Sequence, residues 1–558
     1  MRGGAGLALG ARRPAERGVA DATVLAALLV AALAWLVLYP LLLVAAEALR
    51  ADVAGFLRSP TEWAALWASV WISVASVVLA AAIGVPLAFL FERYDFPGRR
   101  VLGTLMALPT VLPPLVGVIA FLFLYGESGF VARAAQAVFG LENAPWRLRG
   151  PGAILLVHAY SMYVYFYLFT RAGLARLDHS MREAAASLGA GRWRTFRRVT
   201  LPLLRPSLGG AALLTFMTAL ASFSAPYVFG GGFRVMTTQI VSTKLNGDLP
   251  TAMLETLALT VVALAGYALL RVGERDGLVV AIGKGTAPRA RTITHPLARW
   301  TTLVLGWGFA VLLLLPHATL LLVALVPEGS WTTEALPPRY SVANFAALFS
   351  EAERLRPLLN SLWMAAVATA AALAAAVLAG HLVVRRRVAL ARPIEWLFAL
   401  PWVVPGTVLA IALATMFGVT RPWAGRFVLV GTAAILPLAY LVRSLPLTGR
   451  AVLAGFRQLD PSLEEAAQSL GAGRWRRLWR VTVPVLRPAL AAGGGLAFVT
   501  ALGDFVASVL LYTYETRPIS IEILSSLRLA DVGVAAAFGV VLMAVSAVAL
   551  GVGARVGR

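Results

Sequence analysis

The ionisable side chains that could do chemistry in this chain are few and lie far apart in the sequence. There are five histidines and no cysteine, and no cluster of histidines and carboxylates has the spacing of metal ligands. Two glutamates, Glu183 and Glu465, each open a charged segment, where capping a helix is a more typical role than acid–base catalysis. We therefore predict no catalytic residue, no metal site and no enzymatic activity.

A phosphate-binding loop is also missing from the sequence. Such a loop reads G-x-x-x-x-G-K-[ST] after a strand, because its glycines let backbone N–H groups cradle phosphates. The Gly-Lys-Gly fragment at 283–285 has neither that spacing nor that context. We expect this chain to bind no cofactor of its own.

One acidic residue, Asp504, falls inside an apolar run of the sequence. A carboxylate within a bilayer costs a few kcal/mol and is usually directed at a cavity or a partner. Asp504 could attract a cationic substrate on a pathway, or it could hydrogen-bond to a neighbouring helix. Tyr163 belongs to a tyrosine-rich run that could line a polar path or pack as an aromatic belt.

The composition indicates that membrane-spanning helices hold these residues. Of 558 residues, 59% are hydrophobic and 14% are charged, whereas about a quarter are charged in soluble domains. The net charge of +22 comes from basic residues in short loops between apolar runs, which is typical of membrane orientation. The sequence predicts an all-α, polytopic membrane protein that contacts lipid and does not bind nucleic acid.

Twelve apolar runs approach the roughly 20 residues that cross a bilayer. They lie at about 23–46, 67–91, 101–125, 152–170, 207–229, 252–270, 300–326, 358–384, 394–416, 428–442, 489–512 and 532–552. The loops between them alternate in charge, and the arginine-rich loops lie on the same side as both ends of the chain. By the positive-inside rule, both termini of this multi-pass protein are predicted to be cytoplasmic.

The runs form two halves of six. Because six is an even number, both halves enter the membrane in the same direction and are parallel repeats. We predict a first six-span domain at 1–270, a polar cytoplasmic linker at 271–299 and a second six-span domain at 300–558.

The clearest repeat is the stretch 177–206, which returns without a gap at 459–488. Each copy predicts a helix, a turn and a second, arginine-rich helix on the predicted cytoplasmic side. Gly189 and Gly471 supply the turns, because glycine enters positive φ without steric cost.

The ends of these repeated helices carry further signals. Asp178 and Asp460 could cap the first helix of each copy, and a Ser-x-x-Glu capping box one half-turn later could do the same. The sequence leaves both caps open. Pro202 and Pro484 are predicted to end the two units.

Two other segments repeat between the halves. ALPTVLP at 107–113 and ALPWVVP at 399–405 open the third run of each half, and their prolines should bend the helix. Such a break suits a protein-lined cavity, although a packing kink is the other interpretation. The fifth runs also align, which pairs Asp504 with Ser222. We take Asp504, Ser222 and Tyr163 as candidate pathway residues.

The repeated stretch resembles the EAA loop of permease subunits of ATP-binding-cassette (ABC) importers. The matching residues are Glu183, Ala184, Ala185, Gly189, Leu201 and Pro202 in the first copy, and Glu465, Ala466, Ala467, Gly471, Val483 and Pro484 in the second. Only Val483 departs, since leucine is usual there. The resemblance covers nearly the whole chain, as a fused permease made of two MetI-like, binding-protein-dependent transport domains.

This resemblance implies partners and a location. Each EAA loop would be a coupling helix seated on a cytoplasmic ABC ATPase dimer, and that partner would use ATP and Mg. A periplasmic or lipid-anchored solute-binding protein would load the outer face. The location implied is the cytoplasmic (inner) membrane of a bacterium.

The stretch 222–248 and the fused layout look most like ferric iron permeases. Fused thiamine and phosphonate permeases share the layout, and a polyamine permease is a further alternative. A different class, the ion-coupled secondary transporter, should carry ionisable groups within its spans and often has inverted repeats. The sequence predicts parallel repeats and one clear intramembrane acid.

Overall fold

A computed structural model describes the chain at residues 14–177, 179–275, 291–331 and 336–556. Helices dominate this described part, whose only strands, β1 (Tyr94–Asp95) and β2 (Arg291–Thr292), form a short parallel pair. The predicted all-α class is confirmed. The predicted linker at 271–299 falls partly outside the described residues.

The helices follow the same order in the two halves. The first half contains α1 (Pro14–Leu33), η1 (Ala34–Leu38), α2 (Tyr39–Ala48), α3 (Val53–Arg58), α4 (Pro60–Arg93), α5 (Arg99–Leu105), η2 (Leu108–Val111), α6 (Pro114–Tyr125), α7 (Phe130–Phe139), α8 (Gly150–Ala175), α9 (His179–Ser187), α10 (Arg192–Thr195), η3 (Phe196–Thr200), α11 (Leu201–Leu220), α12 (Ser224–Phe229), α13 (Met236–Leu245) and α14 (Leu249–Arg275). The second half contains α15 (Pro296–Ala324), α16 (Ala343–Ser350), α17 (Ala352–Gly380), η4 (His381–Arg385), α18 (Ala391–Val403), α19 (Gly406–Phe417), η5 (Pro422–Ala424), α20 (Ile435–Gln458), α21 (Pro461–Ser469), α22 (Arg474–Arg477), η6 (Leu478–Thr482), α23 (Val483–Leu502), α24 (Val506–Leu511), α25 (Ile519–Arg528) and α26 (Val532–Val556).

Within the described residues, ten helices are long and apolar enough to cross a membrane. The pair α18 and α19, bent by 110° at the break between Val403 and Gly406, brings the number to eleven when it is counted as one span. The remaining predicted run, 428–442, corresponds to α20, whose 24 residues reach about 36 Å. α20 is less apolar than the other spans because Arg443 and Arg450 lie along it. The polytopic fold is confirmed, but the tenth run begins and ends later than the sequence predicted.

The fifth span of each half is broken, which the sequence did not predict. The run predicted at 207–229 divides into α11 and α12, and the run at 489–512 divides into α23 and α24. The break residues, 221–223 and 503–505, occupy equivalent positions in the repeat.

Hydrogen bonds from neighbouring helices stabilise these breaks. Pro226 has no N–H for the carbonyl of Ser222, which instead accepts a hydrogen bond from the Thr237 hydroxyl at 2.8 Å. In the second half, the carbonyl of Asp504 accepts from the Ser520 hydroxyl at 2.7 Å. The freed backbone groups are therefore satisfied inside the protein, as a membrane requires.

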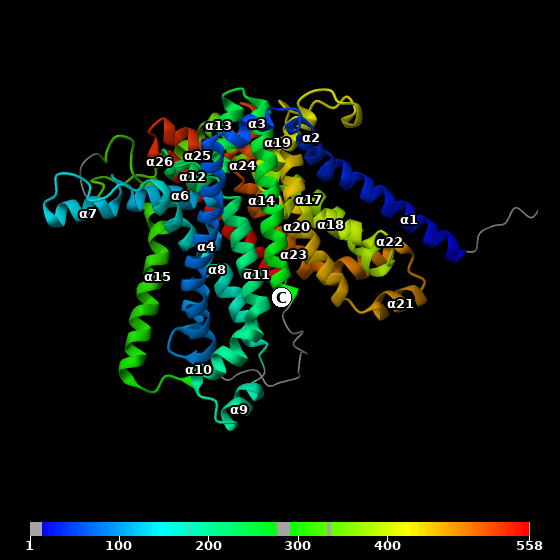
Figure 1. Cartoon of the computed structure of the whole chain (residues 1–558), viewed down its shortest axis with the longest axis horizontal. Coiled ribbons are helices and arrows are strands. Elements are labelled where there is room, and N and C mark those ends of the chain that lie inside the picture. The colour runs from blue at the N-terminus through cyan, green and yellow to red at the C-terminus, as the bar shows by residue number, and fades with distance from the viewer. Residues whose placement is uncertain (1–13, 178, 276–290, 332–335, 557–558) are drawn as a thin grey trace, which may run out of the picture.

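The first span of each half packs against the other half. α1 and α2 lie along α18 and α19, and α15 lies along α6 (Figure 1). The sixth spans cross the same junction, because α14 packs on α19 and α26 packs on α6. One buried apolar cluster accordingly joins Leu115 and Phe223 of the first half to Leu320 and Phe505 of the second. The two halves form one interlocked unit.

The two ends of the molecule differ in how closely the halves approach. α12, α13, α24 and α25 gather at the top of Figure 1, whereas α9 and α21 lie apart on its lower side. We call the end with α13 and α25 the outer end and the end with α9 and α21 the coupling end. The repeated EAA residues lie at the coupling end.

Candidate functional site

Each coupling unit, 177–206 or 459–488, turns at a left-handed glycine. Gly189 and Gly471, which stand two residues after the last residue of α9 and of α21, have φ values of 76° and 79°. The amide of Ala190 then returns to the carbonyl of Ala185 at 2.9 Å, which closes the end of α9. The predicted glycine turns are confirmed.

The second coupling unit shows which cap begins its first helix. The Asp460 carboxylate accepts a hydrogen bond from the Ser462 amide at 2.9 Å, directly before α21. This backbone hydrogen bond lowers the pKa of Asp460 below its ordinary value. Of the two caps that the sequence left open, the aspartate cap is the one present here. Asp178 lies outside the described residues.

The prolines of the coupling units do not end a helix. The helical path runs from α10 through the π-helical turn η3 into α11, where Pro202 stands in the first turn. The second unit repeats this path through η6, with Pro484 in the first turn of α23. A π turn already departs from i→i−4 bonding, so the missing proline N–H disturbs it little. The prediction that these prolines end the units is wrong.

Both coupling units expose large apolar side chains at equivalent positions. Leu188 and Leu470 are each 88% exposed, and Trp193 and Trp475 are 71% and 74% exposed. Around them, the EAA residues that are exposed are Glu183, Ala184, Gly189, Glu465, Ala466 and Gly471, and those that are half-buried are Ala185, Leu201, Pro202, Ala467, Val483 and Pro484. Apolar surface of this kind is typical of a site that a partner covers.

Each coupling unit is fastened to the second span of its own half. In the second half, Glu464 of α21 pairs with Arg385 at 3.3 Å and accepts from the Thr482 hydroxyl at 2.8 Å. In the first half, the ring of Phe196 packs edge-on against Phe89, with 5.7 Å between centroids. Each unit therefore contacts the second span of its half and is continuous with the fifth span.

Asp504 lies at the break in the fifth span of the second half, where it pairs with Arg443 of α20. Its side chain is 3% exposed, whereas that of Arg443 is 26% exposed. The second carboxylate oxygen accepts from the Ala507 amide at 2.8 Å. Arg443 lies against Gly406, where an added Cβ would stand 2.9 Å from the guanidinium group. The acid is thus neutralised between the third, fourth and fifth spans.

Ser222 takes the equivalent place in the first half. Its hydroxyl lies 2.9 Å from Nε2 of His158 in α8, and Nδ1 of His158 lies 2.8 Å from the hydroxyl of Ser76 in α4. In the second half, Tyr440 of α20 stands at the position of His158 and bonds to Ser508 at 2.7 Å. A polar contact therefore joins the fourth span to the broken fifth span in both halves.

Two phenylalanines meet where the two breaks face each other. Phe223 and Phe505 occupy equivalent positions in the repeat, and their ring centroids lie 5.5 Å apart. They are 1% and 2% exposed. The ring of Tyr227 also packs on Phe505, at 5.8 Å, and its hydroxyl accepts a hydrogen bond from Arg528. These contacts close the junction between the halves toward the outer end.

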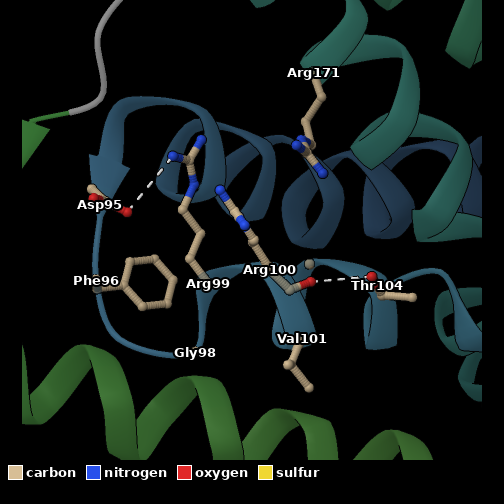
Figure 2. A pocket seen from close by; sticks show the side chains of 9 residues that line it. Asp95, Phe96, Gly98, Arg99, Arg100, Val101, Thr104 and Arg171 are labelled. Carbon is tan, nitrogen blue, oxygen red and sulfur yellow. Dashed lines mark hydrogen bonds and ion pairs between the residues drawn. The ribbon is translucent and has the colours of Figure 1, made fainter.

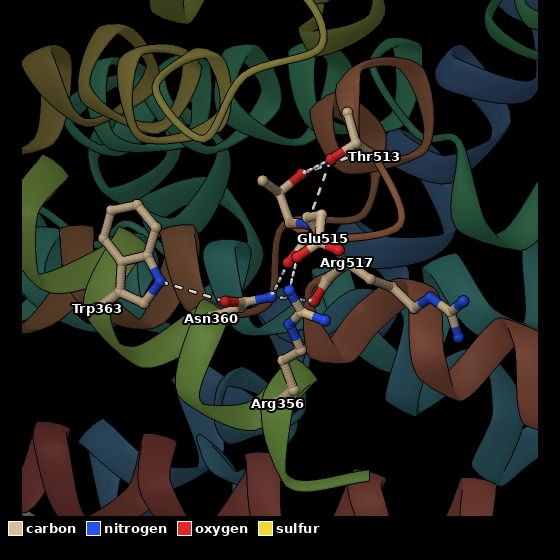
Figure 3. A network of polar contacts seen from close by, with 7 residues as sticks. Arg356, Asn360, Trp363, Thr513, Glu515 and Arg517 are labelled. Atoms are coloured by element: carbon tan, nitrogen blue, oxygen red, sulfur yellow. Dashed lines mark hydrogen bonds and ion pairs between the residues drawn. The ribbon is translucent and has the colours of Figure 1, made fainter. Parts of the chain in front are cut away.

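The outer loop between α24 and α25 is fastened to α17 (Figure 3). The side-chain amide of Asn360 donates to the carbonyls of Glu515 and Arg517 at 3.0 and 3.1 Å. Beside it, the Ser361 hydroxyl accepts the amide of Ile519 at 2.8 Å, and the first half has the matching bond between α4 and α13. The second span therefore holds the outer helix of its half as well as the coupling unit.

Tyr163 lies away from the other two candidate pathway residues. It is fully buried in α8, and its hydroxyl donates to the carbonyl of Met106 at 2.6 Å. That carbonyl belongs to the break between α5 and α6, just before Pro109. The structure places Asp504 and Ser222 at the facing breaks of the fifth spans, and it places Tyr163 in the packing of the third span.

A second buried acid was missed in the sequence. Glu255 lies fully buried in α14 and accepts from the Thr243 hydroxyl at 2.7 Å, while nearby Glu62 accepts from Gln239 at 3.4 Å. The expectation of one intramembrane acid is therefore wrong. Among the residues that the structure describes, no group of three or more His, Cys, Asp or Glu could hold a metal ion.

Comparisons with known proteins extend over most of the chain. Residues 80–275 and 369–558 match the family described as "Binding-protein-dependent transport system inner membrane component". A probable ABC transporter permease protein of Sinorhizobium fredii is 33% identical over 86% of this chain and 84% of its own. A ferric transport system permease protein of Actinobacillus pleuropneumoniae is 28% identical over 85% of this chain and 67% of its own. A thiamine transport system permease protein of Salmonella typhimurium is 29% identical over 77% of both.

Proposed function

The chain belongs to the binding-protein-dependent transport system inner membrane component family, and we propose that it is the two-domain permease of a ferric iron ABC importer. It lies in the bacterial inner membrane with both termini in the cytoplasm. Its domains are 1–270 and 300–558, joined by the linker 271–299. A cytoplasmic ATPase dimer uses ATP and Mg for it, and a periplasmic or lipid-anchored solute-binding protein delivers solute to the outer end.

The observation that carries this proposal is the matched apolar surface on the two coupling units. Leu188 and Trp193 recur as Leu470 and Trp475 with nearly the same exposure. A single exposed patch could arise by chance, but two patches at equivalent positions suit a partner with two equivalent grooves, such as an ATPase dimer.

The anchors of the coupling units suggest how ATP-driven closure acts on the spans. Closure of the dimer would bring α9 and α21 together, and the contacts at Phe89 and Arg385 would carry this movement into the second spans. The outer ends are in contact through Phe223 and Phe505, while the coupling ends lie apart (Figure 1). We take this arrangement as the inward-facing state, in which the phenylalanine pair is the closed outer gate.

Ferric iron is proposed because ferric transport permeases are similar to this chain over most of its length. A hard trivalent cation prefers oxygen ligands and needs compensating negative charge when it is buried. Asp504 can serve the cation only if Arg443 leaves it, and the partial exposure of Arg443 allows that movement. Thiamine is the alternative substrate, because thiamine permeases are also similar.

The docking part of the proposal is tested by placing charge on the exposed leucines. Leu188→Asp with Leu470→Asp should abolish iron uptake and release the ATPase in co-purification, because buried carboxylates would oppose docking. Leu529→Asp is the control, since Leu529 is 77% exposed at the outer end. A double variant that keeps both the ATPase and its uptake would contradict the docking assignment.

The substrate is tested separately. Proteoliposomes that contain the permease, its ATPase and its solute-binding protein should accumulate radioactive ferric iron on addition of ATP. Transport of thiamine without iron would reject the substrate and leave the importer assignment in place.

A further inference from the structure

A basic cavity of about 840 Å³ opens at the coupling end of the first half (Figure 2). It is lined by β1, the loop that follows it, the short helix α5 and the end of α8, and none of the EAA residues lines it. Arg99, Arg100 and Arg171 turn their guanidinium groups toward this space (Figure 2). Asp95 is the one carboxylate among the lining residues. The three arginines therefore give the cavity lining a formal charge of +2.

Two of the arginines are positioned by the protein. Arg99 donates from Nε to the carbonyl of Phe91 at 2.7 Å, and its ion pair with Asp95 spans 3.9 Å. Arg171 pairs with Glu92 at 3.4 Å and donates to the hydroxyl of Tyr167 at 3.0 Å. These contacts leave N–H groups of both guanidinium groups available to another acceptor.

Arg100 differs from its two neighbours. Its side chain is exposed, and no acceptor for it lies among the residues that the structure describes. A third guanidinium group with free donors beside two fixed ones is suited to an oxyanion such as phosphate, which accepts several charge-assisted hydrogen bonds.

Apolar side chains border the same cavity. Val101 of α5 lines it and is 56% exposed. Gly98, at its edge, lies against Trp307 of α15, because an added Cβ would stand 3.5 Å from the indole ring. Along α15, Trp307 and Val304 are 44% and 66% exposed. A bound phosphate would therefore have an apolar surface next to it, at the place where the spans end.

The second half does not repeat this set of three arginines. The alignment of the third spans places Ala391 at the position of Arg99 and Arg392 at that of Arg100. The alignment of the coupling units places Leu453 at the position of Arg171. One of the three arginines remains in the second half, so Arg392 offers a matched control on the same side of the membrane.

We propose that this cavity binds the phosphate of an anionic phospholipid, whose acyl chains lie along Val101 and the exposed face of α15. Free phosphate shares the headgroup chemistry, but the apolar border favours the lipid. Basic pockets between membrane helices on the cytoplasmic side are suited to such headgroups. The lipid would join the ends of α4, α5 and α8 beside the first coupling unit.

The test measures lipid binding to the purified full chain. Delipidated protein in detergent is titrated with phosphatidylglycerol or phosphatidylcholine, and bound lipid is counted by native mass spectrometry. Arg100→Gln should weaken phosphatidylglycerol binding about fivefold, because one basic residue near an anionic lipid is worth about 1 kcal/mol. Arg100→Lys should keep most of the binding, and Arg392→Gln should leave it unchanged.

Three outcomes would overturn the proposal. Equal losses in Arg100→Gln and Arg392→Gln would indicate general surface charge, and no loss in Arg100→Gln would remove the site. Displacement of phosphatidylglycerol by a millimolar excess of inorganic phosphate would assign the cavity to free phosphate.

Discussion

Asp504 lies buried among membrane spans, where its carboxylate pairs with Arg443 and accepts a hydrogen bond from the Ala507 amide. Asp504→Asn leaves Arg443 without its partner, so we expect the free energy of unfolding to fall by about 3 kcal/mol. The double variant Asp504→Asn with Arg443→Gln should recover most of this loss, because no unpaired charge remains. Chemical unfolding in detergent measures both values.

Uptake assays on the same variants separate a pathway role from a structural one. If Asp504 serves the pathway, the double variant should take up iron slowly even though the stability of that variant is restored. A double variant that is stable and transports iron at the rate of the unmodified chain would make Asp504 and Arg443 a packing pair.

Phe223 and Phe505 are proposed to close the pathway at the junction of the halves. Replacing both by alanine removes two buried rings from the gate, so we expect passive leak of small ions in liposomes without ATPase. Phe456→Ala is the control, because Phe456 is also fully buried but packs against Gly380 within the second half. Equal leak in the control and the double variant would mean that general loosening, and not an open gate, admits the ions.

Some of these residues could be predicted from sequence and others could not. The internal repeat was sufficient to pair Ser222 with Asp504, because this pairing follows from aligning the two halves of the sequence. Arg443 was missed since its contact with Asp504 spans 61 positions and depends on how α20 packs against the broken fifth span. Glu255 lies in the predicted run 252–270, so the signal that singled out Asp504 was present for Glu255 as well and was overlooked. Its hydrogen bond with Thr243 could not be predicted, because Thr243 belongs to a different helix.

At the scale of helices, prolines marked the breaks of the third spans in both halves, whereas the fifth spans have a proline near the break only in the first half, at Pro226. Pro109, Pro113, Pro401 and Pro405 each remove a backbone donor, and this signal is local and readable. The fifth spans break at residues that read as a continuation of the apolar run. Their carbonyls are satisfied by hydroxyls of α13 and α25, so those breaks depend on tertiary contacts.

The first turn of α21 depends on the Asp460 cap. Asp460→Ala should speed amide exchange at Ser462 and Leu463, whereas Ser462→Ala should leave exchange at Leu463 slow, because the aspartate cap remains. Hydrogen exchange followed by mass spectrometry measures both. The opposite pattern would favour the capping box.

The same cap predicts a pH dependence. Hydrogen bonding to the carboxylate lowers the pKa of Asp460 in the folded chain. The stabilisation is therefore complete above the ordinary aspartate value of about 4 and is lost as pH falls through the lowered value. The protection of the amides at the start of α21, measured as the ratio of intrinsic to observed exchange rate, should stay constant down to about pH 4 and fall only below it.

At the scale of the whole molecule, each half packs its first span against the other half, and we call this arrangement the exchange of first spans. Because of it, the two halves depend on each other. α2 packs against α19 and α14 on one side of the junction, and α15 packs against α6 and α26 on the other. These contacts pair equivalent spans, as expected for parallel repeats related by a twofold axis along the membrane normal. The sequence predicted the parallel halves but not the exchange, because apolar periodicity does not specify which helices pack together.

Parallel halves give a sharp prediction for membrane topology, which the absence of cysteine makes simple to measure. Ser187 and Ser469 occupy equivalent positions in the coupling units, and Asn246 and Leu529 occupy equivalent positions after α13 and α25; all four are exposed. Cysteines introduced at the first pair should react with a membrane-impermeant maleimide only from the cytoplasm, and those at the second pair only from outside. Within each pair both sites must react from the same side, because inverted halves would place equivalent residues on opposite faces. Labelling of Ser187→Cys and Ser469→Cys from different sides would therefore contradict the parallel arrangement, and with it the docking of one ATPase dimer on both coupling units.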